Sequence, residues 1–146
     1  MSTSQIGEVI DAILEGLSAL PGLGDVNIFS GQVTVEAAGL ECIAFGGGTL
    51  DEIAFAMGGS REETWTIGGE TRVFRTWEGS TEATIKSARD RALEIFAEVE
   101  TYLNDYYGST FPDTQISTAE LASNVTAEGQ ECRIAFEFVV KAVKNP

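Results

Sequence analysis

The fold of this 146-residue chain is decided largely by its stretch ECRIAFEFVVKAV, which runs from Glu131 to Val143. The side chains in this stretch alternate in character. One side carries Cys132, Ile134, Phe136, Phe138 and Val140, and the other carries Arg133, Glu137 and Lys141. A period of two over so many residues is typical of a half-buried β-strand. We therefore expect the chain to place a long strand in its core, close to its C-terminus.

The sequence before this segment predicts the rest of a sheet. Apolar and β-branched runs indicate further strands at Val26–Phe29, Leu40–Phe45, Glu63–Thr76 and Gln115–Val125. The run at Leu40–Phe45 is mostly apolar, so we expect that strand to be central. A turn at Thr126–Gln130 joins the last of these strands to the C-terminal one. Within the third run, Gly68-Gly69 fits either a two-residue hairpin turn or a bulge in one long strand.

Two segments have the periodicity of amphipathic helices. In the first, which Pro21-Gly22 ends, the apolar residues at helical spacing are Ile6, Val9, Ile10, Ile13, Leu14, Leu17 and Leu20. The second follows an N-cap at Ser80 or Thr81, and its apolar arc consists of Ile85, Ala88, Ala92, Ile95, Phe96, Val99, Leu103 and Tyr106. We expect the two helices to pack beside each other on the sheet.

The connection between the second and third strands is unusually apolar. It opens at Gly46-Gly-Gly48, closes at Gly58-Gly-Ser60, and contains Leu50, Ile53, Phe55 and Met57. Such a segment could fold onto the domain as a short helical turn, or it could form a mobile arm that buries its apolar residues against another chain. We favour the arm, because glycine at both ends permits movement. Residues 46–60 are therefore the predicted interaction loop.

The chain is strongly acidic, with a net charge of −14 at pH 7. All nine Lys and Arg residues lie at or after Arg61, so the acids of the first sixty residues have no compensating bases. Because clustered bases are needed to neutralise phosphate, we expect neither nonspecific nucleic-acid binding nor attraction to anionic membranes. The acidic surface is either simply solvated, or it faces a basic partner or something negative that must pass without sticking.

Length and mean hydropathy place the chain among single-domain globular proteins, with one domain spanning residues 1–146. We expect no signal peptide and no membrane span, because no apolar run approaches about twenty residues. Cys42 and Cys132 fall on apolar strand faces. Two buried free thiols are therefore expected, in preference to a disulfide.

No catalytic constellation is recognisable. The chain has no histidine, which removes Ser-His and Cys-His pairs and imidazole metal ligands. Its glycines match neither of the common phosphate-binding spacings. Glu62 and Glu63 are neighbours on a predicted strand, so they should point to opposite faces and not act as a carboxylate pair. We predict no enzymatic activity, no metal site and no cofactor.

The aromatic residues are expected mainly in the core. Four of them, at strand positions with a period of two, could line a ligand pocket but are more often core residues: Trp65, Phe74, Phe136 and Phe138. Trp77, at the end of a predicted strand, is expected to be partly exposed and is a candidate interaction residue. Tyr107, at the end of the second helix, is a candidate interface residue, since tyrosine is enriched at interfaces.

In the order and patterning of these elements, nearly the whole chain resembles the tail terminator proteins of long-tailed bacteriophages, particularly those of actinobacterial phages. The similar stretches are Ile6–Leu20, Phe45-Gly-Gly-Gly-Thr-Leu-Asp-Glu52, Arg61-Glu-Glu-Thr-Trp-Thr-Ile67, Ala88-Arg-Asp-Arg-Ala-Leu-Glu-Ile-Phe-Ala-Glu-Val-Glu100 and Glu128-Gly-Gln-Glu-Cys-Arg-Ile-Ala-Phe-Glu-Phe-Val-Val140. In that family the third of these stretches runs into one long strand, which favours a bulge at Gly68-Gly69.

The resemblance implies an α+β fold, with a mixed or antiparallel sheet covered on one face by two helices. It also implies a structural protein of the virion that is assembled in the host cytoplasm. Six copies would form a homohexameric ring that caps the tail tube protein, stops tube growth and meets the head–tail connector. Double-stranded DNA would pass through this ring without specific binding, and a negatively lined pore would suit that passage.

Two other readings compete with this one. The chain could be a different tail or neck component, such as a tail-tube subunit or a head–tail adaptor. It could also belong to another class, as a small ligand-binding or enzymatic α+β domain that uses the concave face of its sheet. A ring-forming protein must assemble into a closed oligomer, whereas a pocket protein need not.

Overall fold

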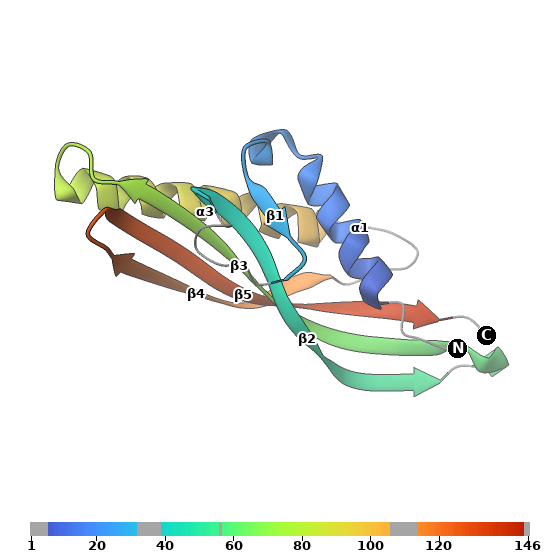
Figure 1. The fold of residues 1–146 in the computed structure, drawn as a ribbon. Helices are drawn as coiled ribbons and strands as arrows, with labels where there is room; N and C mark the ends of the chain where they lie inside the picture. The colour runs from blue at the N-terminus through green and yellow to red at the C-terminus, as the bar shows by residue number, and fades with distance from the viewer. Residues whose placement is uncertain (1–5, 32–38, 56, 106–113, 145–146) are drawn as a thin grey trace.

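The computed structural model describes residues 6–31, 39–55, 57–105 and 114–144, and it has an α+β architecture (Figure 1). Its elements are α1 (Ile6–Ser18), η1 (Pro21–Leu23), β1 (Asn27–Phe29), β2 (Glu41–Phe55), η2 (Met57–Gly59), β3 (Arg61–Thr76), α3 (Thr81–Asp105), β4 (Gln115–Val125) and β5 (Gly129–Lys144). The strands form one five-stranded sheet in the order β1-β2-β3-β5-β4. The pairing of β1 with β2 is parallel and the other pairings are antiparallel. The predicted fold class is confirmed.

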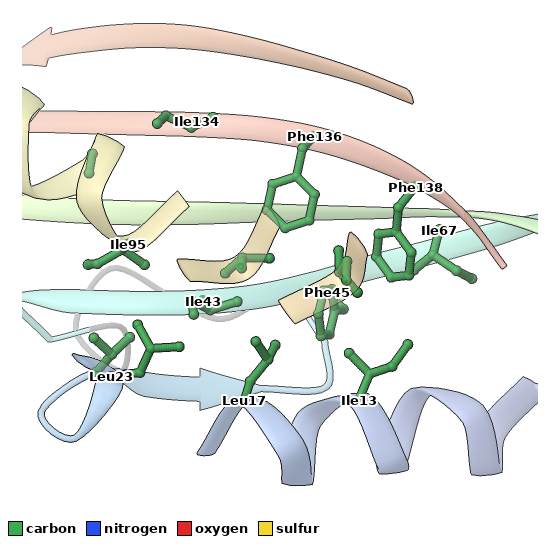
Figure 2. Close-up of a cluster of buried hydrophobic side chains, with 14 of the residues drawn as sticks. Ile13, Leu17, Leu23, Ile43, Phe45, Ile67, Ile95, Ile134, Phe136 and Phe138 are labelled. Carbon is green, nitrogen blue, oxygen red and sulfur yellow. The ribbon is translucent and has the colours of Figure 1, made fainter. Parts of the chain in front are cut away.

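The two helices cover the same face of the sheet, and the core lies between them and the strands. In Figure 1, α3 runs along β3 and β5 while α1 lies beside it, over the β1 side of the sheet. A single cluster of buried residues joins both helices to the sheet, and it includes Ile13 and Leu17 of α1, Ile95 of α3 and Ile43 of β2 (Figure 2). The helix-covered face of the sheet is hereafter called the helix face, and the other is called the open face.

The C-terminal strand has the predicted alternation. Its residues on the helix face, Cys132, Ile134, Phe136, Phe138 and Val140, are all buried, and Glu137 on the open face is exposed. The ring of Phe136 packs edge-on against Phe45, with 6.4 Å between the ring centroids. Gly69 lies against both of these rings, and a Cβ atom there would come within 2.8 Å of each. This glycine therefore makes room for the aromatic centre of the core.

The predicted helix boundaries also agree with the structure. The main helix begins at Thr81, and the Ser80 hydroxyl accepts a hydrogen bond from the backbone N–H of Ala83 at 3.1 Å, so Ser80 is its N-cap. The first helix ends at Ser18, shortly before Pro21.

The prediction of a loop at residues 46–60 is wrong. Strand β2 continues through Phe55 and pairs with β3 down to Arg61, so only the short η2 turn interrupts the hairpin. The turn is tight because Gly58 and Gly59 both have positive φ angles, of 83° and 84°. Pairing with β3 hydrogen-bonds the backbone of this apolar segment, a stabilisation that a loop lacks.

The glycine pair at Gly68-Gly69 lies inside one continuous strand, so the long-strand interpretation is confirmed and the hairpin turn is excluded. The irregularity itself is in the partner strand. The register of β2 against β3 shifts between Phe45 and Gly47, which places a bulge at Gly46, opposite the glycine pair. Sequence alone could not assign the bulge to a strand, because both strands carry glycines at this level.

The carboxylate of Glu41, at the start of β2, joins three parts of the fold. It accepts hydrogen bonds from Arg75 of β3 at 2.6 Å and from Arg91 of α3 at 3.0 and 3.1 Å. Arg91 also reaches the carbonyl oxygen of Gly22, at 3.4 Å. Burial alone would raise the pKa of Glu41, but the hydrogen bonds from the two arginines outweigh it and hold the pKa below its usual value.

This linkage predicts how stability depends on pH. Because the pKa of Glu41 is lowered by folding, its stabilisation is complete above the ordinary glutamate pKa of about 4.3 and is lost as the pH falls through the lower folded value. We expect Glu41→Gln to lower the free energy of unfolding by about 1–3 kcal/mol at pH 7 and to flatten its decline below about pH 4.3. Urea unfolding across pH 3–7 measures both effects.

Glu94→Gln is the matched control, since Glu94 also pairs with Arg91, at 2.6 Å, but is exposed to solvent. Its effect on the free energy of unfolding should stay below about 0.5 kcal/mol. An acid profile of Glu41→Gln that is parallel to the wild-type profile would contradict the assignment.

Candidate interaction site

The hairpin formed by residues 46–68, hereafter the arm, extends the sheet past the end of the helix layer. Figure 1 shows the far halves of β2 and β3 continuing, together with the end of β5, beyond both helices. The arm is held by regular antiparallel pairing to β5, from Arg61 opposite Lys144 to Gly68 opposite Glu137. It is therefore a projecting part of the sheet and not a separate loop.

Three predicted interaction residues meet on the helix face of the arm. Leu50 pairs with Trp65, Ile53 with Glu63, and Phe55 with Arg61. These partners alternate along β3, so they point to the same face as Ile67 and the core.

A second bulge makes this arrangement possible. A strand without irregularity would place Leu50 and Ile53 on opposite faces, since they are three residues apart. The register of β2 shifts between Leu50 and Glu52, and the extra residue brings both side chains to the helix face. Leu50, Ile53 and Phe55 are 36%, 40% and 77% exposed. They form one exposed apolar strip, which we call the arm strip.

A buried carboxylate lies beside the arm strip. Glu63 is only 1% exposed, forms an ion pair with Arg61, and accepts a hydrogen bond from the indole N–H of Trp65 at 3.1 Å. Glu62 points to the open face and lies 3.4 Å from Lys141. The two acids therefore occupy opposite faces, as predicted. The sequence indicated their direction but not the burial of Glu63, which depends on the arginine and tryptophan two residues to either side.

The remaining predicted interface residues do not join this strip. Trp77 lies past the other end of β3, is half-buried, and donates its indole N–H to the carbonyl oxygen of Thr126 at 3.2 Å. The predicted partial exposure of Trp77 is confirmed. Its hydrogen bond to Thr126 stabilises the β4–β5 turn. Tyr107 and the side chain of Met57 lie outside the described residues.

A second exposed apolar surface, which the sequence did not reveal, lies at the opposite edge of the sheet. Leu121 and Val125 of β4 are 48% and 74% exposed, and Leu93 of α3 is 44% exposed. Leu121 pairs with Ile134 and Val125 with Gln130, both buried on the helix face. The signal available in the sequence was that Gln115–Val125 contains one charged residue, Glu120, and no proline.

Leu93 is level with Leu121. It lies one helical turn from both Arg89 and Phe96 on the same side of α3. Phe96 packs on Phe136, with 5.8 Å between ring centroids. Burial raises the pKa of the Cys132 thiol, and Arg89 lies close enough for its charge to oppose part of that rise. Since Cys132 and Phe136 flank the partner of Leu121 on β5, the three exposed residues follow one edge. Leu93, Leu121 and Val125 are hereafter the β4 strip.

The open face carries a shallow depression of about 580 Å³ above the strand glycines. Gly47 and Gly68 form its floor, and nothing lies within contact distance of a Cβ atom built at Gly47. Glu70 and Glu137 stand at its rim. Glu70 is already engaged by Arg72, at 2.6 Å, so this rim does not offer a free pair of carboxylates.

The described residues offer little for catalysis. Burial raises the pKa of both the Cys42 and the Cys132 thiol, so each stays protonated and is a poor nucleophile. Both thiols are buried and free, as predicted. No group of three or more His, Cys, Asp or Glu side chains in the described ranges is placed to hold a metal ion.

Comparison with known proteins adds no assignment. No protein-family model matches the chain, and no curated protein sequence matches it significantly. Within the part of the chain that the structure describes, no helix combines the length and apolar composition needed to cross a membrane.

Proposed function

We propose that this chain is a structural protein of a bacteriophage virion, a tail terminator whose copies form a ring between the tail tube and the head–tail connector. The observation that carries the proposal is the arm, which projects past the helix layer and exposes Leu50, Ile53 and Phe55 on one face. Contiguous apolar surface on a projecting element is typical of a contact with another protein. The sequence resemblance supplies the kind of assembly.

The charge balance supports the same proposal. A net charge of −14 repels phosphate, so a ring of such subunits could surround DNA without binding it. The fold is also compatible with a purely structural role, because the carboxylate of Glu63 is hydrogen-bonded within the protein and both thiols are buried.

The proposal can be tested by electron cryomicroscopy of the particle of the phage whose genome encodes this chain. We expect density for the chain as a single ring at the junction of head and tail. Many stacked rings along the tail would instead assign the chain as a tail-tube subunit. Its absence from the purified particle would refute a virion role altogether.

A ligand-binding function is the second candidate, and the depression over Gly47 and Gly68 is the observation that favours it. Its floor is backbone that a flat ligand could approach closely. Calorimetric titration with small-molecule libraries, compared between wild type and Gly68→Val, separates this candidate from the first. Specific binding that the valine abolishes would favour it.

A further inference from the structure

We propose that the arm strip of one copy packs against the β4 strip of a second copy, so that the free edge of β2 adds to the free edge of β4 and the two sheets become continuous. Copies of the chain would associate through these two surfaces. It extends the proposed function but does not depend on it, since such association could serve any assembly.

Among the residues that the structure describes, each of these two edges lacks a neighbouring strand on its outer side. Strand β1 pairs with β2 only at residues 42–44, and no described strand pairs with the outer side of β2 from residue 46 to Phe55. Strand β4 is the last strand on the other side, and no described strand pairs with its outer side along Gln115–Val125. Exposed edges of this length readily accept another strand unless charge or proline protects them. In β4 only Glu120 does so; on the free edge of β2 the charged residues are Glu52 and Asp51, and Asp51 accepts a hydrogen bond from the Thr66 hydroxyl.

The two apolar strips are placed to meet. Both lie on the helix face of the sheet, each at its own edge. When two sheets join edge to edge with their helices on the same side, residues of that face become neighbours across the junction. With Asp51 opposite Glu120 in an antiparallel junction, Leu50 would lie against Leu121, Ile53 and Phe55 would lie against the half of β4 that begins at Gln115, and Val125 would lie against the Gly46 end of the β2 edge.

The strand directions suit this junction. The pairings of β2 with β3, β3 with β5, and β5 with β4 are all antiparallel, so β2 and β4 run in opposite directions. Copies that keep the same orientation along the chain of contacts therefore join β4 to β2 in antiparallel fashion, with hydrogen bonds perpendicular to the strands. The contact is heterologous, because an arm meets an edge and not another arm.

The offset along the strands between the β4 edge and the β2 edge allows successive copies to close into a ring. Ala44 of β2 is level with Glu120, the centre of β4, through Glu70 and Ala135. Asp51, at the centre of the free β2 edge, is about six residues farther along, or roughly 20 Å. Across the sheet, β2 of one copy is separated from β2 of the next copy by four strand spacings, or roughly 19 Å. These two offsets tilt the strands by roughly 45°, close to the tilt in closed β-barrels, so the repeat can form a ring.

Two lysine variants test the contact. The arm variant carries Leu50→Lys and Phe55→Lys, and the edge variant carries Leu121→Lys and Val125→Lys. All four positions are exposed, so both variants should fold, which circular dichroism checks. In native mass spectrometry and sedimentation velocity we expect the full-length wild-type chain to form closed oligomers as concentration rises, and each variant alone to remain monomeric.

Mixing the variants gives the sharpest result. Each variant keeps one intact surface, so an equimolar mixture should form one-to-one dimers and nothing larger, which labelling one variant with ¹⁵N identifies. Leu40→Lys, an exposed leucine before β2, is the matched control and should associate like the wild type.

Several results would overturn the inference: a wild-type chain that is monomeric throughout, a mixture that stays monomeric, a variant that still self-associates, or a control that does not associate. Because the measurement needs only purified protein, it stands apart from the virion experiment. Association without a virion location would reject the proposed function and leave this contact in place.

Discussion

Phe136→Ala is expected to lower the free energy of unfolding by about 3–5 kcal/mol. Phe136 is 2% exposed, and its ring packs on Phe45, Phe96 and Phe138 at centroid distances between 5.8 and 6.4 Å. Truncation leaves a cavity where sheet and α3 meet, and Gly69 beneath it has no side chain to fill the space. Since total stability of a domain is about 5–15 kcal/mol, the loss is a large fraction.

Urea denaturation followed by tryptophan fluorescence measures this loss. Phe55→Ala is the matched control, because it removes the same atoms from a ring that is 77% exposed. Its effect should stay within about 0.5 kcal/mol. Similar losses at the two positions would mean that Phe136 does not occupy the core as described.

Replacing Leu50, Ile53, Phe55 and Met57 together with serine is expected to leave the monomer folded but to abolish tail joining. The three described side chains of this set are exposed and contribute little to the core, whereas an interface loses its apolar anchors. The measurement is complementation of a phage that lacks the gene, scored as infectious particles and as free heads and tails in micrographs. We expect unjoined heads and tails in place of virions.

Leu40→Ser serves as the control, since it also replaces an exposed leucine but lies outside the arm. It should restore infectious particles to the wild-type level. If the fourfold serine variant assembled normal particles, the arm would have no part in joining, and the proposed function would lose the observation on which it rests.

The elements of the fold could be predicted because each has a strong local signal. The alternation from Glu131 to Val143 and the helical arc, followed as far as Leu103, both required one buried face, and both occur in the structure. The apolar residues of the arm were also recognisable. Their conformation was not, because the glycines at 46–48 and 58–59 are equally typical of a loop, and only pairing with β3 makes the segment a strand.

Sequence by itself therefore determined the α+β class, the buried side of each long element and the presence of exposed apolar residues near Phe55. Tertiary structure alone decided which face those residues share, that Glu63 is buried, and that Leu93, Leu121 and Val125 form a second strip. The physical reason is the distance along the chain over which each feature is determined. Periodicity reports burial along one element, whereas a bulge or a free edge depends on strands that are distant in the chain.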